Sequence, residues 1–89
     1  MVDIKYTQNF YNNASKISKL LSSIGIKEND IVLDVGAGKG ILTNELSKYS
    51  KNVIAYELDS EYFEILKHSF HDRKNILLVN EDFTQVHLQ

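Results

Sequence analysis

The chain has 89 residues, of which 43% are hydrophobic and 25% are charged, a globular composition with room for one small domain at most. The lack of cysteine excludes a disulfide framework, and the sequence shows neither a bilayer-length apolar run nor a secretory signal. We therefore expect a cytoplasmic protein without a membrane partner. The formal net charge of −2 argues against strong nucleic-acid binding by this chain alone, because phosphate binding needs clustered cations.

The first 25 residues are expected to form an arm followed by one helix. Residues 1–12 are polar with isolated aromatic side chains, which favours an irregular arm. In residues 13–25 the apolar residues recur at helical spacing, and Asn13 and Gly25 suit the two ends of a helix. No proline, repeat or linker divides the chain, so we expect a single continuous unit.

Residues 30–89 alternate between strand and helix signals. Short β-branched runs bounded by turn residues predict strands, and the segments between them carry apolar residues at helical spacing. Right-handed crossovers return each strand in the same direction, so this order predicts a Rossmann-like α/β fold with three parallel strands. The predicted strands are residues 31–35, 52–56 and 76–79; the helices between them carry Leu42, Leu46 and Tyr49, then Phe63, Leu66 and Phe70, with Asp59 or Ser60 as a cap.

A glycine loop follows the first of these strands. The stretch Asp34–Gly40 reads Asp-Val-Gly-Ala-Gly-Lys-Gly, and glycines allow a tight turn and close approach of a ligand to the main chain. Ile41 stands where a dinucleotide-binding loop has its third glycine, and Gly40 stands where a P-loop has Ser or Thr. The loop therefore favours a nucleoside site of another kind, or a strand-to-helix turn that binds nothing.

Two acidic residues follow the next two predicted strands. Glu57 could accept hydrogen bonds from both hydroxyls of a ribose, with Leu58 packed on a purine. Asp82 could accept from an adenine amine, with the Phe83 backbone N–H bound to the ring. Each residue could instead be an ordinary surface acid or a core residue. Acids at three successive strand ends beside a glycine loop together favour nucleoside binding.

Four segments together resemble the ribosomal RNA adenine N6-methyltransferases, which include the macrolide-resistance Erm enzymes and the housekeeping KsgA-type dimethylases. The most discriminating is Gln8-Asn9-Phe10, because the glycine loop and the acids also occur in many other class I methyltransferases. The resemblance implies a class I fold that binds S-adenosylmethionine and a parent enzyme that methylates an adenine of ribosomal RNA. The other three segments are residues 34–43, Tyr56-Glu57 and Glu81-Asp82-Phe83.

The resemblance also implies a role for each matching position. It places Gln8 and Asn9 near the methionine end of the cofactor, and it gives Asp34 the role of ordering the loop. The remaining cofactor-binding positions that it implies are Gly36 and Gly38 through their backbone, Ala37 in the same wall, Glu57 on the ribose, Leu58 on the adenine face, and Asp82 and Phe83 on the adenine edge.

The chain departs from the family pattern in what it lacks. Family members carry an Asn-x-Pro-Tyr loop that orients the target base, and this chain contains no proline. We therefore expect residues 30–89 to be a cofactor-binding half without the catalytic loop or the helical RNA-binding domain, and the chain alone to be inactive. Contact with ribosomal RNA would then use other parts of the parent protein. An uncovered edge on the strand 31–35 would favour self-association.

Other interpretations remain open at this level. The chain could be a nucleoside-binding or assembly module without catalysis, whereas the glycine spacing disfavours a nicotinamide-dependent oxidoreductase. His68 and His71 lie three residues apart on a predicted helix, but no further metal ligands accompany them, so we expect no metal site. Resistance and housekeeping roles, and transfer of one or two methyl groups, are not distinguished.

Overall fold

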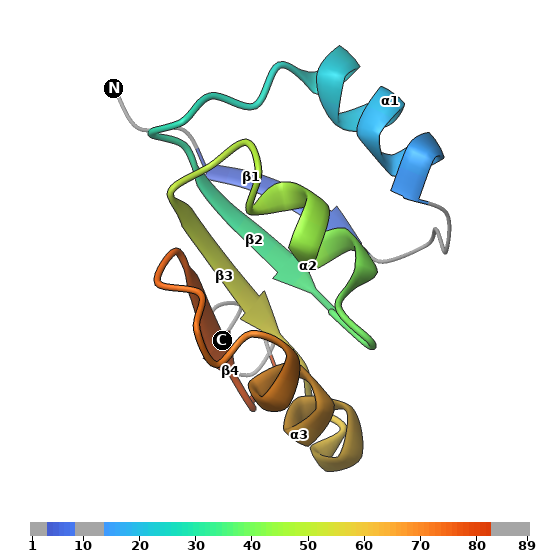
Figure 1. Cartoon of the computed structure of the whole chain (residues 1–89), viewed down its shortest axis with the longest axis vertical. Helices are drawn as coiled ribbons and strands as arrows, with labels where there is room; N and C mark the ends of the chain where they lie inside the picture. The colour runs from blue at the N-terminus through green and yellow to red at the C-terminus, as the bar shows by residue number, and fades with distance from the viewer. Residues whose placement is uncertain (1–3, 9–13, 83–89) are drawn as a thin grey trace.

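The protein forms one parallel four-stranded sheet with three helices, shown in Figure 1. The structure is a computed structural model and describes residues 4–8 and 14–82, without the side chains of residues 4–8 and 14. The strand order is β1-β2-β3-β4, which confirms the predicted Rossmann-like α/β class. The elements are β1 (Ile4–Gln8), α1 (Ala14–Ile24), β2 (Ile31–Val35), α2 (Ile41–Leu46), β3 (Asn52–Tyr56), α3 (Ser60–Ser69) and β4 (Ile76–Val79).

Strand β1 was not predicted from the sequence. It pairs in parallel with β2 from Ile4 opposite Ile31 to Gln8 opposite Val35, so the expectation of an irregular arm is wrong for these residues. The expected uncovered edge on β2 is wrong for the same reason, and the argument for self-association through that edge fails with it. The segment Ile-Lys-Tyr-Thr-Gln contains β-branched and aromatic residues, which favour pairing with an available strand edge.

The three helices pack on one face of the sheet. Because the strands follow one another in chain order, right-handed crossovers place every connecting helix on the same side. Figure 1 shows α2 lying across β2 and β3, with α1 and α3 on either side of it. One core cluster contains Ile17, Leu21, Ile26, Val32, Leu42, Leu46 and Val53; a second contains Ala37, Ala55, Leu66 and Phe70.

The helix ends follow the sequence signals. Asp59 is the N-cap of α3, and its side chain accepts hydrogen bonds from the backbone N–H groups of Glu61 and Tyr62 at 2.9 and 3.1 Å. Gly25 follows the last residue of α1, and its N–H donates to the Leu21 carbonyl. None of the helices in the described ranges has the length and apolar character that a membrane crossing demands.

The glycine loop packs closely against α3 at Gly40. Gly40 has a φ of 89°, and a Cβ placed on it would lie 2.7 Å from Cε2 of Phe70 and 2.9 Å from Cδ2 of Leu66. Both of these side chains belong to the core, so they have little room to move. Gly36 has a φ of 76°, but no atom of the described residues beyond its chain neighbours lies within 4 Å of a Cβ placed on it.

We predict that Gly40→Ala lowers the free energy of unfolding by about 3 kcal/mol, because it combines a left-handed backbone with an overpacked core. Gly36→Ala is the matched control, since it carries the backbone strain alone and should cost about 1 kcal/mol. Urea unfolding followed by circular dichroism measures both. Equal losses in the two variants would contradict the close packing of Gly40.

Candidate functional site

The carboxyl ends of the four strands form one row. In the strand register Gln8 lies beside Val35, Val35 beside Tyr56, and Tyr56 beside Val79. The next residues continue the row, because the Gly36 N–H donates to the Tyr56 carbonyl at 2.9 Å and the Glu57 N–H donates to the Val79 carbonyl at 3.0 Å. The fold therefore brings the backbones of the predicted residues Gln8, Gly36 and Glu57 together at the carboxyl ends of the strands.

The glycine loop is anchored by backbone hydrogen bonds and leaves space beside the backbone of Gly36. The N–H groups of Gly36 and Ala37 both donate to the Tyr56 carbonyl, at 2.9 and 3.1 Å, and these bonds anchor the loop on β3. The Gly40 N–H donates to the Ala37 carbonyl at 3.0 Å and closes the turn. Apart from its two chain neighbours, no atom of the described residues lies within 4 Å of a Cβ placed on Gly36, so a ligand has access to its backbone there.

Glu57 binds the loop and the start of α3 with the same carboxylate. Its Oε1 accepts a 2.6 Å hydrogen bond from the Gly38 N–H, and its Oε2 accepts one of 3.0 Å from the Asp59 N–H. The residue is only 9% exposed. Each carboxylate oxygen has two lone pairs, so both oxygens retain capacity for further donors such as hydroxyl groups. The carboxylate is thus held in a fixed position beside the loop.

Asn80 is a site residue that the sequence did not suggest. Its Nδ2 donates to the backbone carbonyls of Glu57 and Leu58, at 2.8 and 3.2 Å. These bonds hold the segment after β3 against the end of β4. Leu58 is 63% exposed there and presents an apolar side chain at the same edge as the Glu57 carboxylate.

The remaining predicted residues are placed unequally. Asp82 is partly buried beyond the end of β4. Ala37 is fully buried and packs with Ala55 and Leu66, and its expected contribution to the wall of the site stays a prediction. Asn9, Phe83 and the side chain of Gln8 lie outside the described residues.

Asp34 is a fully buried acid beneath the loop. Its Oδ2 accepts a 2.5 Å hydrogen bond from the Thr43 hydroxyl, whereas its Oδ1 has no partner among the described residues. Burial raises the pKa of Asp34 from 3.8 to about 6 against the opposing effect of the Thr43 hydrogen bond, and the negative charge of Glu57 raises it further. The ionised carboxylate is therefore disfavoured at this place in the fold.

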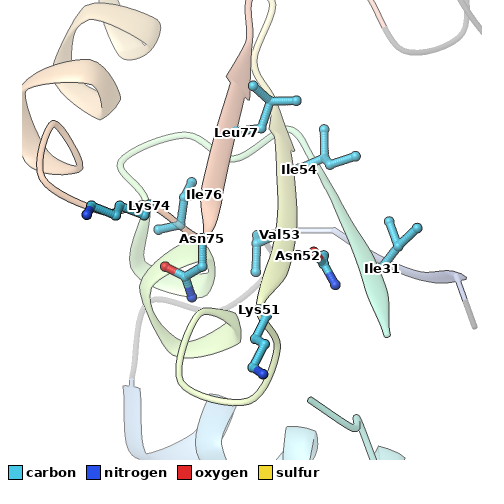
Figure 2. Close-up of a pocket in the computed structure, with 9 residues that line it drawn as sticks. All are labelled: Ile31, Lys51, Asn52, Val53, Ile54, Lys74, Asn75, Ile76 and Leu77. Atoms are coloured by element: carbon cyan, nitrogen blue, oxygen red, sulfur yellow. The ribbon is translucent and has the colours of Figure 1, made fainter. Parts of the chain in front are cut away.

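A hollow of about 420 Å³ lies at the amino ends of β3 and β4, as Figure 2 shows. Its lining includes Asn52 and Asn75, which lie at the amino ends of β3 and β4, and the side chains of Lys51 and Lys74. Ligands of parallel sheets lie at the opposite, carboxyl ends. The hollow is therefore separate from the row that carries Gly36 and Glu57.

His68 of α3 and His71 of the turn after it lie near each other. The ring centroids of His68 and His71 are 6.4 Å apart, and His71 Nδ1 is 3.0 Å from the His68 carbonyl oxygen. Over residues 4–8 and 14–82, no group of three or more His, Cys, Asp or Glu side chains is placed to hold a metal ion.

Comparison with known proteins agrees with this geometry. The family model described as ribosomal RNA adenine dimethylase matches residues 2–89. The chain belongs to this family. Its members use S-adenosylmethionine as the methyl donor, and the family match confirms the resemblance seen in the motifs.

Individual family members match at moderate identity. The ribosomal RNA small subunit methyltransferase A of Caldanaerobacter subterraneus is 40% identical over 94% of this chain, and an rRNA adenine N-6-methyltransferase of Escherichia coli is 35% identical over 93%. The crystal structure of the 23S rRNA methyltransferase ErmE superposes with a TM-score of 0.74 at 31% identity, over 84% of this chain. This chain spans about a third of each, namely 31%, 34% and 31% of their lengths.

We predict that Asp34→Asn becomes more stable relative to the wild type as the pH rises. Since the pKa of Asp34 is raised from 3.8 to about 6, the folded protein binds more protons than the unfolded chain between these values. The wild type should therefore lose up to about 3 kcal/mol of unfolding free energy as the pH increases from about 4 to about 6, and the variant should not.

Urea unfolding of both proteins across this pH range measures the difference, in which the titration of all other groups cancels. Asn can still accept the Thr43 hydrogen bond, so it is a close substitute in shape. A stability difference that does not change with pH would contradict the raised pKa.

Proposed function

We propose that this chain forms the S-adenosylmethionine-binding part of a ribosomal RNA adenine N6-methyltransferase. The observation that carries the proposal is the Glu57 carboxylate, which is fixed by the Gly38 and Asp59 N–H groups beside the open backbone of Gly36. Parallel α/β sheets bind nucleotide-like ligands at this edge. Membership of a methyltransferase family supplies the identity of the ligand.

The residues at the edge fit an adenosyl group. The Glu57 carboxylate has lone pairs left for the two ribose hydroxyls, and the exposed Leu58 offers an apolar surface for the purine. Asp82 lies beyond the end of the neighbouring strand, where its carboxylate would accept hydrogen bonds from the exocyclic amine, with Phe83 next to it in the chain. The methionine end would lie toward Gly36 and the end of β1.

The contribution of this chain to methyl transfer is positioning. S-adenosylmethionine supplies the methyl group on a positively charged sulfur. The Gly38 and Asp59 N–H groups of the chain itself hold Glu57 in place, so little side-chain ordering remains to be done on binding. Holding the donor in one orientation before the acceptor arrives is a large part of catalysis in reactions of this type.

We further propose that the acceptor is the N6 amine of an adenine in ribosomal RNA. Matching relatives include small-subunit rRNA methyltransferases and ErmE, a 23S rRNA methyltransferase. Both kinds match over most of this chain, so the acceptor is assigned to ribosomal RNA without a choice of subunit. A role in macrolide resistance is proposed on the motif resemblance to the Erm enzymes alone. A ribosomal substrate supports a cytoplasmic location.

We expect calorimetric titration to show binding of both S-adenosylmethionine and its demethylated product. Glu57→Ala should weaken both by about tenfold or more, because it removes charge-assisted hydrogen bonds to the ribose and frees the loop. Glu64→Gln is the control, because Glu64 is exposed on α3, where it pairs with Lys67 at 3.1 Å. Absence of heat with either ligand, in protein shown by circular dichroism to be folded, would overturn the proposal.

We also expect the 89-residue chain to transfer no methyl groups on its own. It contains no proline and therefore no Asn-x-Pro-Tyr loop to hold the acceptor base. Incubation with radiolabelled S-adenosylmethionine and ribosomal RNA tests this, with a full-length family member as positive control. Methyl incorporation above background would show that the chain carries its own acceptor site.

A further inference from the structure

The site contains a buried acidic group that has no cationic partner among the described residues. Asp34 is 0% exposed, its Oδ2 is bound by the neutral Thr43 hydroxyl, and its Oδ1 has no partner among the described residues. It lies two residues before Gly36 on β2 and beside Ala55 of β3 in the strand register. A charge on this carboxylate is therefore poorly screened by solvent and acts over several ångströms.

The described side chains of the neighbouring elements do not neutralise this charge. Glu57 adds a second carboxylate at the next strand end, where it accepts hydrogen bonds from two backbone N–H groups. Glu45 of α2 pairs with Lys48, which follows the helix, at 2.9 Å. Of the other titratable groups near this end of the strands, Tyr56 is buried and Asp82 is partly buried. The remaining ones are exposed, namely Lys39 of the loop, Asp59 before α3, Glu61, Glu64, Lys67 and His68 of α3, and Glu81 after β4; the Lys5 side chain lies outside the described residues.

We propose that Asp34 makes this site distinguish the cationic methyl donor from its uncharged product, so that the ionised Asp34 carboxylate favours S-adenosylmethionine over S-adenosylhomocysteine. This inference rests on the proposed function of the same site. The two ligands share the adenosine, the amino group and the carboxylate, and they differ by one methyl group and one positive charge on sulfur. The ratio of their affinities therefore reports the electrostatic environment of the sulfur.

The direction of the pH dependence follows from this difference. A positive sulfur favours ionised Asp34, so the donor complex should hold Asp34 at a lower pKa than the product complex does. Because the pKa of Asp34 without ligand is about 6, the preference for the donor should rise as the pH increases from about 5 to about 7 and then level off. A difference of half a unit to one unit between the complexes corresponds to a change of about three- to tenfold in the ratio.

The test is a calorimetric titration of both ligands at about pH 5, 6, 7 and 8, with folding checked by circular dichroism at each pH. In the wild type we expect the ratio of the two affinities to rise by about three- to tenfold. It should stay constant in Asp34→Asn, which cannot ionise. Glu81→Gln is the matched control, since it removes an acid at the same edge that is exposed to solvent, and it should follow the wild type.

A constant ratio in the wild type, or an unchanged rise in folded Asp34→Asn, would overturn the inference while leaving the proposed function intact. Failure of both ligands to bind would overturn the proposed function instead. If Asp34→Asn does not fold, proton release by the wild type decides, measured near pH 6 in two buffers of different ionisation enthalpy. The donor should then release more protons than the product, and equal release would refute the role of Asp34.

Discussion

The double hydrogen bond of the Glu57 carboxylate is the interaction on which the site depends. One oxygen binds the Gly38 N–H and the other binds the Asp59 N–H, so a single side chain joins the glycine loop to the N-cap of α3. Asp59 in turn binds the first N–H groups of α3, so the loop, the end of β3 and the helix start are linked in series. A residue that would hold a ribose therefore also determines the shape of the loop around it.

Much of the fold could be predicted from the sequence, because its local signals agree with its tertiary structure. The β-branched runs give β2, β3 and β4, and Asp59 caps α3 as expected. Glycine spacing and the acids at the strand ends locate the edge that carries the site. Strand β1 could not be predicted in this way, because its pairing depends on an edge of β2 that lies 27 residues away, from Ile4 to Ile31.

The contacts that were missed depend on tertiary structure. Asn80 binds two backbone carbonyls more than twenty residues back in the chain, and no spacing rule connects them. The Thr43 hydroxyl reaches Asp34 only because α2 folds over β2. Ala37 lies within the glycine motif, but the close approach of α3 buries it. A buried acid such as Asp34 destabilises the fold when ionised, and such costs are characteristic of functional sites.

The simple strand order has a consequence for how the chain reaches its native state. Each strand pairs with the strand that precedes it in the sequence, at separations of 27 residues from Ile4 to Ile31, 21 from Ile31 to Asn52 and 23 from Val53 to Ile76. No strand has to pair beyond its neighbour in the sequence, but each pairing still closes a loop of more than twenty residues and costs the entropy of doing so. Parallel pairing over such separations is non-local and slows folding, whereas the strand-helix-strand order lets each unit serve as a template for the next.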